Sequence, residues 1–431
     1  MSKNSPEAGV GSPESKANPS LTLDSRLPTP DYFLSVYERL AAWCRGRGYA
    51  GHDPFDALNS RLFRATPLGR SRLARLVWTQ AFKRSPVNLR RLALVPEGRN
   101  AKGTALFALA ALARLRASGH GARGREEFGR EARALLDDLL AARIATRSGA
   151  AWGYNFDWQG RAFFAPRGTP TVVPTAFAAR ALVEAAHAFG AGDAAPYLDA
   201  ARGACEFILR DLNRSEESDE EVCFSYTPLD RTRVFNASLL AGEALAAVGA
   251  LAGERELKEA AARAARYVVR RQRADGSWAY GADSYQSWAD NFHTAFVLTS
   301  LARAVGVCEA ELGAEAAAAR AAVARGYAFW RDSFFLADGW PKYYHSSAYP
   351  ADAHSAGAAV VACAELRGWQ PDALELGRRV AGWAVRELFD ERGFFYYQRR
   401  RTGRVRTPYM RWSQAWMAYA LARMMEVDSR Q

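Results

Sequence analysis

Two short stretches of the 431-residue chain combine side chains that can move a proton and hold a negative charge. Asp290, Asn291 and His293 form one set, and Asp352 and His354 repeat its pattern about 60 residues later. An amide or imidazole can neutralise a carboxylate, so that the proton on the adjoining carbon becomes removable, and a histidine or tyrosine can take and return it. The sequence therefore predicts lyase- or epimerase-like chemistry on an acidic saccharide, with His293 as the leading base or acid. The candidate catalytic residues are His293, Asp290, Asn291, His354, Asp352 and Tyr280.

Aromatic and polar residues near these sets are candidates for contacting sugar rings. The predicted substrate-binding residues are Trp152, Tyr154, Asn236, Trp278, Tyr285, Trp340, Tyr344, Arg411 and Trp412. A structural interpretation stands beside this one, because Asp is a favoured N-cap and the aromatic residues recur at one loop position. A metal site would need a carboxylate from another repeat beside the two histidines. We predict neither a metal nor a cofactor.

These residues belong to a repeat of about 60 residues. Five Ala- and Gly-rich segments share one layout, and a weaker sixth copy begins at Lys102. The polar residues that align at the start of the five segments are Thr175, Asn236, His293, His354 and Gln414. Helices with more charge lie between them, with apolar residues at i, i+3, i+4 and i+7. The pattern predicts inner helices buried on all sides and outer helices with one exposed face.

Short connections make successive helices antiparallel neighbours, and small inner residues let six helices approach one axis. We predict an all-α fold, an (α/α)6 toroid of about six helical hairpins that covers residues 29–431 as a single domain. Residues 1–28 are polar and predict a disordered leader. The inner helices would begin at one end of the ring, where their positive dipole ends favour an anion.

The charge balance also favours an anionic partner, because Lys+Arg is 58 against Asp+Glu 46. Apart from a run over residues 399–406 the basic residues are scattered, which argues against a nucleic-acid binder. That run is either a solvated loop or a segment that binds phosphate or a membrane surface. Peripheral membrane contact is therefore one predicted use of it. Neither a transmembrane segment nor a secretory signal is predicted. Five isolated cysteines fit a reducing cytoplasm.

The segment RAARYVVRRQRADGSW, residues 263–278, resembles the QW repeat of the triterpene cyclases. Gln272, Gly276 and Trp278 are the matching positions. The resemblance implies a structural role, in which the motif ties one helical hairpin to the next. The Asp-rich acid motif of those cyclases and the zinc set of the protein prenyltransferase β subunits have no counterpart here.

A broader resemblance rests on GHDPFDALNS (51–60), KRSPVNLRRL (83–92), WADNFHTAFVL (288–298) and YPADAHSAG (349–357). These stretches look like a bacterial group of prenyltransferase/squalene-cyclase-like repeat proteins found with exopolysaccharide biosynthesis genes. Some members carry a delta-aminolevulinic acid dehydratase label, which this helical repeat chain does not support. The resemblance implies the fold and a polysaccharide context, and it assigns no role to residues 51–61 and 83–92.

Three functions are compatible with these observations. The first is a lyase- or epimerase-like enzyme acting on an acidic saccharide, and the second is a terpene-cyclase- or prenyltransferase-like enzyme on an isoprenoid or lipid-linked substrate. The predicted partner is an acidic saccharide or a lipid-linked saccharide. The second needs an aromatic cavity that contains a carboxylic acid. The third is a non-catalytic scaffold that binds a glycan or a protein without turnover.

Overall fold

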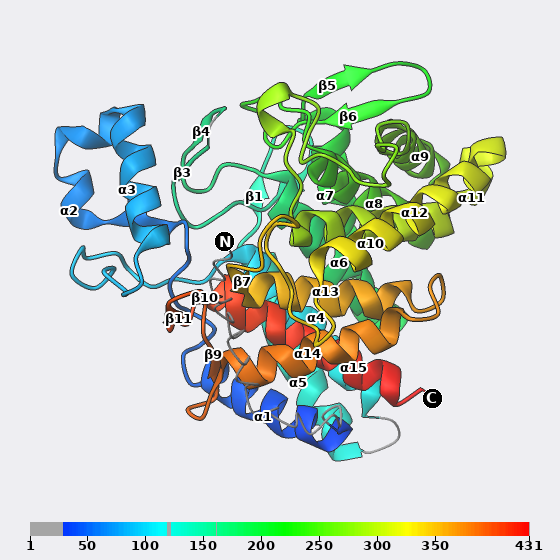
Figure 1. Ribbon diagram of the computed structural model, residues 1–431. Coiled ribbons are helices and arrows are strands. Elements are labelled where there is room, and N and C mark those ends of the chain that lie inside the picture. Colours follow the sequence, from blue (N-terminus) through cyan, green and yellow to red (C-terminus); the bar gives the residue numbers. More distant parts are fainter. Residues whose placement is uncertain (1–28, 119–121, 161, 431) are drawn as a thin grey trace, which may run out of the picture.

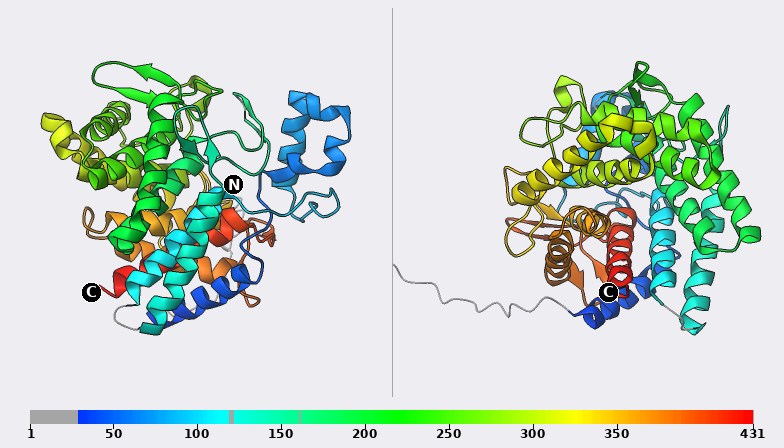
Figure 2. Two further views of the ribbon diagram at one scale, coloured as in Figure 1. Left: turned by 180° about the vertical axis from the view of Figure 1, so that it is seen from behind. Right: turned by 90° about the vertical axis from the view of Figure 1, so that its right-hand side faces the viewer.

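Six Ala- and Gly-rich helices form the inner wall of a ring in the computed structural model, which describes residues 29–118, 122–160 and 162–430. They are α4 (Ala101–Ala117), α6 (Val172–Ala188), α8 (Phe235–Ala252), α10 (Asn291–Val307), α13 (Ala353–Leu366) and α15 (Trp416–Asp428), the last preceded by the π-helical segment η5 (Met410–Ala415). Each inner helix packs against the next along the chain, and α15 packs against α4. The ring is therefore closed, as the right-hand view of Figure 2 shows by colours that run around it.

An outer layer covers this ring (Figure 1). Its helices are α1 (Pro30–Arg45), α5 (Ala122–Ala141), α7 (Ala191–Arg210), α9 (Arg255–Val269), α12 (Ala316–Phe334) and α14 (Ala373–Leu388). Five of them pack on the inner helix that precedes them in the chain, whereas α1 packs on α15. The two ends of the described chain thus complete the sixth pair, and the predicted (α/α)6 toroid is confirmed.

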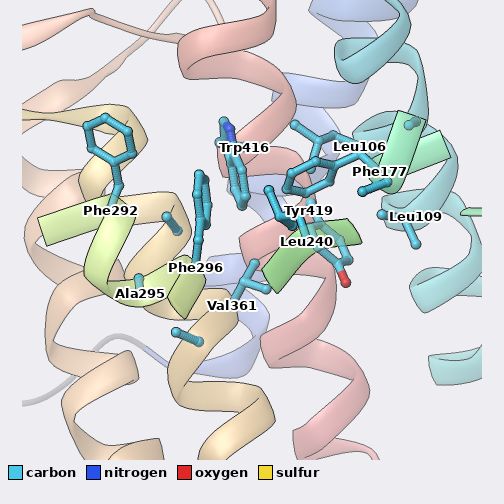
Figure 3. Close-up of a cluster of buried hydrophobic side chains, with 14 of the residues drawn as sticks. Leu106, Leu109, Phe177, Leu240, Phe292, Ala295, Phe296, Val361, Trp416 and Tyr419 are labelled. Atoms are coloured by element: carbon cyan, nitrogen blue, oxygen red, sulfur yellow. The ribbon is translucent and has the colours of Figure 1, made fainter. Parts of the chain in front are cut away.

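Small residues allow the inner helices to approach closely. A Cβ atom added at Gly357 of α13 would lie 2.9 Å from the Cβ of Trp416, so no larger residue fits there without a shift. Large aromatic rings fill the space at the centre, where Phe177, Trp416 and Phe296 lie side by side from three different helices (Figure 3). These aromatic rings therefore fill the centre of the ring of helices, below the N-termini of the inner helices.

A circuit of ion pairs joins all six inner helices nearer their C-terminal ends. The six interhelical pairs are Arg116–Glu184, Arg180–Glu243, Glu243–Arg303, Arg303–Glu365, Glu365–Arg423 and Glu426–Arg116. Burial opposes the charge of Glu243, but Arg180 and Arg303 outweigh it and hold the pKa of that carboxyl below its usual value. The circuit closes the ring at the end opposite the helix N-termini.

The motif that resembles a QW repeat has the tying role that the resemblance implied. Gln272 Nε2 donates to the carbonyls of Gly276 and Ala322, each at 2.9 Å, and so links the end of α9 to α12. Trp278 Nε1 donates to the carbonyl of Val268 at 2.9 Å. Gly276 has a φ of +86°, and a Cβ there would lie 2.6 Å from the carbonyl oxygen of Arg325. Glycine is required because the turn is left-handed and packed against backbone.

Short strands form only small antiparallel sheets in the described residues. They are β1 (Ile144–Ala145), β2 (Ala150–Ala151), β3 (Trp158–Gln159), β4 (Phe164–Ala165), β5 (Arg214–Glu217), β6 (Val222–Phe224), β7 (Ala351–Asp352), β8 (Phe389–Asp390), β9 (Phe394–Phe395), β10 (Gln398–Arg400) and β11 (Gly403–Val405). Eight of these strands form four two-stranded sheets, and β11, β10 and β7, in that order, form one three-stranded sheet. Single helical turns interrupt other loops: η3 (Ser284–Gln286), α11 (Glu309–Leu312) and η4 (Gly313–Glu315).

Between α1 and α4 the chain leaves the ring. This excursion contains η1 (Asp56–Asn59), α2 (Arg61–Arg64), η2 (Pro67–Arg70) and α3 (Arg72–Arg84). It stands out from the helical body beside the β3–β4 hairpin (Figure 1). Arg75 Nε donates to Gln159 Oε1 at 2.8 Å and fixes α3 to that hairpin. The repeat pattern gave no sign of this subdomain, because its segments have no periodicity in common with the ring.

One inner helix has the length and composition of a membrane-spanning helix. By length and composition α8 is long and apolar enough to cross a membrane, although no transmembrane segment was predicted. It is an inner helix of the ring, however, and 78% of it is buried by its neighbours. The predicted leader, residues 1–28, lies outside the described residues.

Candidate active site

A cavity of about 550 Å³ lies at the end of the ring where the inner helices begin. The first turns of all six helices contribute to its wall, through Lys102, Val173, Asn236, His293, His354 and Arg411. Aromatic residues of the connecting loops supply most of the remaining wall: Tyr154, Phe156, Trp158, Phe163, Tyr226, Tyr280, Tyr285, Trp288, Tyr343 and Tyr344. The predicted convergence of helix N-termini at one mouth is thus present.

Asp290 positions His293 at the cavity wall. Asp290 is the N-cap of α10, where its Oδ1 accepts the backbone N–H of His293 at 2.9 Å. Its Oδ2 lies 2.7 Å from His293 Nδ1. A carboxylate accepts only, so Nδ1 carries the hydrogen and Nε2 is left to exchange a proton with a ligand. The pair has the base-and-orienter geometry of a general acid–base catalyst.

His354 lies deeper, in an aromatic cage. Its ring centroid is 4.0 Å from that of Trp412, 4.5 Å from Phe292 and 5.0 Å from Trp416. Burial, followed by the charges of Lys102 and Arg411, holds the pKa of His354 well below its ordinary value, so the ring is neutral. Both ring nitrogens are buried and have no hydrogen-bond partner among the described residues. Such orphaned atoms at a cavity wall are satisfied when a polar ligand enters.

Both histidines lie against the same phenyl ring. The centroid of Phe292 is 4.1 Å from His293 and 4.5 Å from His354. The two imidazoles therefore face one volume from neighbouring helices, as the repeat spacing predicted. This arrangement offers two proton-transfer groups to a single substrate.

Three cationic side chains also line the cavity, and no aspartate or glutamate is among its described lining residues. Lys102 lies over the rings of Phe177, Phe296 and Trp416 at 4.4–5.2 Å and makes no ion pair within the described structure. Burial lowers the pKa of Lys102 well below its ordinary value, and Arg411 and Arg180 lower it further. An anionic ligand would favour the charged form of this amine, so the cavity favours a negative group.

Asp53, in the excursion between α1 and α4, holds Arg411 in place. Arg411 Nε and Nη2 donate to the two carboxylate oxygens of Asp53 at 2.6 and 2.8 Å. Arg90 in turn donates to Asp56, to the carbonyl of Asp53 and to Tyr409. Burial disfavours the charge of Arg411, but Asp53 outweighs it and raises the pKa of the guanidinium. Residues 51–61 and 83–92, to which the sequence assigned no role, thus position this arginine, and Lys83 of the same excursion lines the cavity.

The cavity tyrosines are protonated donors rather than bases. Burial, with Asp290 as the next cause, raises the pKa of Tyr280, and its ring stacks on Trp288 at 4.3 Å. The hydroxyls of Tyr154 and Tyr226 lie 3.2 Å apart. Burial raises the pKa of both phenols. Tyr280 stays a candidate catalytic residue, and its raised pKa favours returning a proton over taking one.

Nine of the fifteen predicted site residues line the cavity. They are His293, His354, Tyr280, Tyr154, Asn236, Tyr285, Tyr344, Arg411 and Trp412. Asn236 presents a buried Oδ1 that has no partner among the described residues. Their catalytic or binding roles stay predictions, but their common location is the one the repeat indicated.

The other six do not line it, for reasons of capping or packing. Asp352 is fully buried as the N-cap of α13 and accepts from Trp412 Nε1 at 3.0 Å, so it supports the wall from behind. Burial raises its pKa. Asp290 acts through His293 rather than by direct contact. Asn291 faces the outer layer, where its amide donates to the carbonyl of Lys342 and accepts from Trp330 Nε1.

Three predicted aromatic contacts are packing residues instead. Trp152 is fully buried and donates to the carbonyl of Leu139 at 2.7 Å. Trp278 has the equivalent bond to Val268. Trp340 donates to the carbonyl of Ala348 and packs against Trp383 at 5.2 Å. Thr175 and Gln414, which align with the histidines in the repeat, bind loop backbone at Trp152 and Phe395.

The sequence analysis missed Lys102 and Lys83 as site residues. Lys102 was visible as the one charged residue in the first three turns of a mostly apolar helix. Lys83 had no such signal, because its position depends on how the excursion folds back. Among the described residues no group of three or more His, Cys, Asp or Glu side chains is placed to hold a metal ion. The carboxylic acid that a terpene-cyclase-like cavity requires is also absent from the described lining.

No protein-family model and no curated protein sequence matches the chain. Its structure resembles the cellobiose 2-epimerase from Bacillus thermoamylovorans B4167, with a TM-score of 0.58, 15% identity and coverage of 77% of this chain and 88% of that one. It also resembles a possible member of the GH105 family from Salmonella enterica subsp. enterica serovar Paratyphi A (TM-score 0.59, 11% identity, 97% and 98% covered). A third similar structure is a glycosyl hydrolase family 88 protein from Bacteroides vulgatus, with a TM-score of 0.57, 7% identity and coverage of 94% of this chain and 99% of that one.

These similarities define the fold class of the protein as an α/α toroid. They lend no support to the prenyltransferase or squalene-cyclase part of the predicted resemblance.

Proposed function

We propose that the protein is a saccharide-modifying enzyme of the epimerase or lyase type, which moves a proton at a carbon atom of an acidic sugar. The observation that carries this proposal is the Asp290–His293 pair at the wall of a cavity that also contains His354. Similarity to a sugar epimerase and to glycoside hydrolases supports a saccharide substrate but does not choose the reaction.

The cavity lining favours proton transfer over glycoside hydrolysis. Most glycosidases use two carboxyl groups that flank the scissile bond. The described lining has no carboxyl group and has two histidines instead. Histidine is suited to take a proton from carbon and return it near neutral pH.

The reaction would use the described residues in three roles. His293 Nε2 removes the proton from the carbon next to the sugar carboxylate. Arg411 and Lys102 stabilise the negative charge that develops on the carboxylate oxygens. His354, neutral and without a partner, can accept a hydrogen bond or a proton on its side of the cavity. Protonation of that carbon from its opposite face, by a cavity tyrosine hydroxyl that is reprotonated from solvent, would give the epimer. Departure of a β-substituent, which would take the proton from His293 Nε2 as it leaves, would give the unsaturated product.

We further propose a role in cell-surface or exopolysaccharide biosynthesis on a free or lipid-linked acidic saccharide. The resemblance of four stretches to an exopolysaccharide-associated group supports this context. The five cysteines are buried and unpaired, which fits the reducing cytoplasm that we propose as its compartment.

The test is a screen for proton exchange. Uronic-acid oligosaccharides, neutral reducing disaccharides and prenyl diphosphates are incubated with the protein in D₂O and followed by proton NMR. We expect a uronate C–H signal to be lost, with or without formation of a new epimer. Turnover of a prenyl diphosphate, or hydrolysis of a glycoside without exchange, would refute the proposal. Tight binding of a uronate without exchange would favour the scaffold function.

A further inference from the structure

Exposed apolar side chains are concentrated on the excursion between α1 and α4. Seven of the thirteen exposed large hydrophobic residues of the described chain lie within residues 61–94: Leu62, Leu68, Leu73, Val77, Val87, Leu92 and Leu94. Single exposed apolar residues are normal on a protein surface, whereas a group of them indicates an interaction surface. We call this group the apolar patch.

Helix α3 presents apolar residues on two faces. Trp78 and Phe82 face inward, with ring centroids 4.9 Å apart. Leu73 and Val77 lie one turn apart on the outward face and are 70% and 60% exposed. Packing within the chain explains the inward face only. The outward face therefore calls for a partner outside the chain.

The excursion around the apolar patch is rich in basic residues, although Arg90 is buried and Arg64 pairs with Asp157. Between Asp56 and Glu97 the chain has no acidic residue and nine basic ones: Arg61, Arg64, Arg70, Arg72, Arg75, Lys83, Arg84, Arg90 and Arg91. A second basic segment adjoins it, because Arg400 of the β10–β11 hairpin donates from Nη1 to the carbonyl of Arg84 at 2.8 Å. That hairpin carries the Arg399–Arg406 run. Two basic segments more than 300 residues apart in sequence thus adjoin each other, and Glu387 pairs with Arg399 and Arg404 of the second one.

We propose that residues 61–94 and the β10–β11 hairpin dock the protein on the surface of an anionic lipid bilayer. Exposed leucine and valine side chains enter the boundary between headgroups and acyl chains, as in other interfacial segments. The surrounding arginines pair with lipid phosphates. The excess of arginine over acidic side chains on this surface favours an anionic bilayer over a protein partner.

The docked surface would adjoin the cavity. Phe55, which precedes the apolar patch in the chain, and Lys83, which lies between Val77 and Val87, line the cavity wall. Docking would therefore bring the cavity mouth close to the lipid headgroups. This inference stands on the excursion and the β10–β11 hairpin and does not depend on the reaction proposed above.

Sedimentation of the full chain with lipid vesicles tests the proposal. We expect binding to vesicles that contain phosphatidylglycerol, little binding to phosphatidylcholine alone, and weaker binding as salt rises. The double variant Leu73→Glu with Val77→Glu should lower the partition coefficient about tenfold or more. Val307→Glu is the control. Val307 is also exposed (38%), but it is the C-terminal residue of α10, at the end of the helix that lies away from the cavity.

Three outcomes would overturn the proposal. The first is absence of binding to anionic vesicles, and the second is equal binding by the double variant and the wild type. The third is an oligomer that the double variant dissociates, which would show that a second copy covers the apolar patch. Circular dichroism melting of both variants excludes loss of the fold as the cause of weaker binding.

Discussion

The carboxyl group of Asp290 holds His293 at two points, through the backbone N–H at 2.9 Å and through Nδ1 at 2.7 Å. One residue thus caps the helix and orients the imidazole. Capping and catalytic support, which the sequence presented as alternatives for Asp290, are compatible in the structure. The two roles can be separated by substitution.

Asp290→Asn should lower kcat about 100-fold while leaving the melting temperature nearly unchanged. Asparagine caps a helix as well as aspartate does, but its amide does not hold Nδ1–H as a carboxylate does. Asp290→Ala should lose the cap as well and cost about 1 kcal/mol of stability. Steady-state kinetics and thermal melting measure the two effects. A fully active Asp290→Asn enzyme would show that the carboxylate has only its capping role.

Lys102→Met should stabilise the fold and abolish binding of an anionic saccharide. The wild-type amine is buried and has no hydrogen-bonding partner among the described residues, which costs about 1 kcal/mol or more, and methionine removes that cost. Because burial lowers the pKa of Lys102 in the folded state, the unfolded chain binds the proton more tightly. Wild-type stability should therefore rise with pH between the folded and unfolded pKa values, and the variant should lack that rise. Urea unfolding at several pH values measures this difference.

Binding of an anionic saccharide should take up protons. The pKa values of Lys102 and His354 are both lowered in the free protein, and a carboxylate placed beside them raises both again. Calorimetric binding enthalpies measured in buffers of different ionisation enthalpy should therefore differ near neutral pH. A neutral saccharide serves as the control and should give the same enthalpy in each buffer. Equal enthalpies for the acidic saccharide would contradict an anion site at these residues.

Glu243→Gln should destabilise the fold by about 3 kcal/mol, because it leaves Arg180 buried without a counter-charge and removes one of the two carboxylates that pair with Arg303. The folded pKa of Glu243 is lowered, so its contribution is present above the unfolded pKa and is lost as pH falls toward the folded one. The variant should thus lose less stability than the wild type on acidification. Glu259→Gln, in an exposed pair with Arg255, should change stability by about 0.5 kcal/mol or less.

The ring of helices and part of the cavity at its mouth could be predicted from the sequence. A repeat of about 60 residues fixes the order of the helices, so His293 and His354 had to fall at equivalent places on neighbouring helices. Periodicity carries no information about contacts between distant segments. Asp53 and Arg411 are 358 residues apart, and nothing in either segment indicates that they form a bidentate pair.

Loop aromatic residues were the least predictable part of the site. Trp152 and Trp278 share one repeat position and a bond to the preceding outer helix, whereas Tyr154 and Tyr280, two residues later, face the cavity. Residue type alone cannot separate them, since tryptophan and tyrosine serve both packing and sugar binding. The closed circuit of ion pairs was likewise hidden, because its members looked like ordinary charges of amphipathic helices.

The most direct test of the proposed chemistry compares two histidine variants for deuterium incorporation into a uronate in D₂O. His293 lies in the cavity wall, whereas His187 is exposed near the C-terminal end of α6. The account predicts that His187→Ala exchanges the sugar C–H at the wild-type rate and that His293→Ala, still folded by circular dichroism, does not exchange it. Exchange by His293→Ala at the wild-type rate would contradict the account.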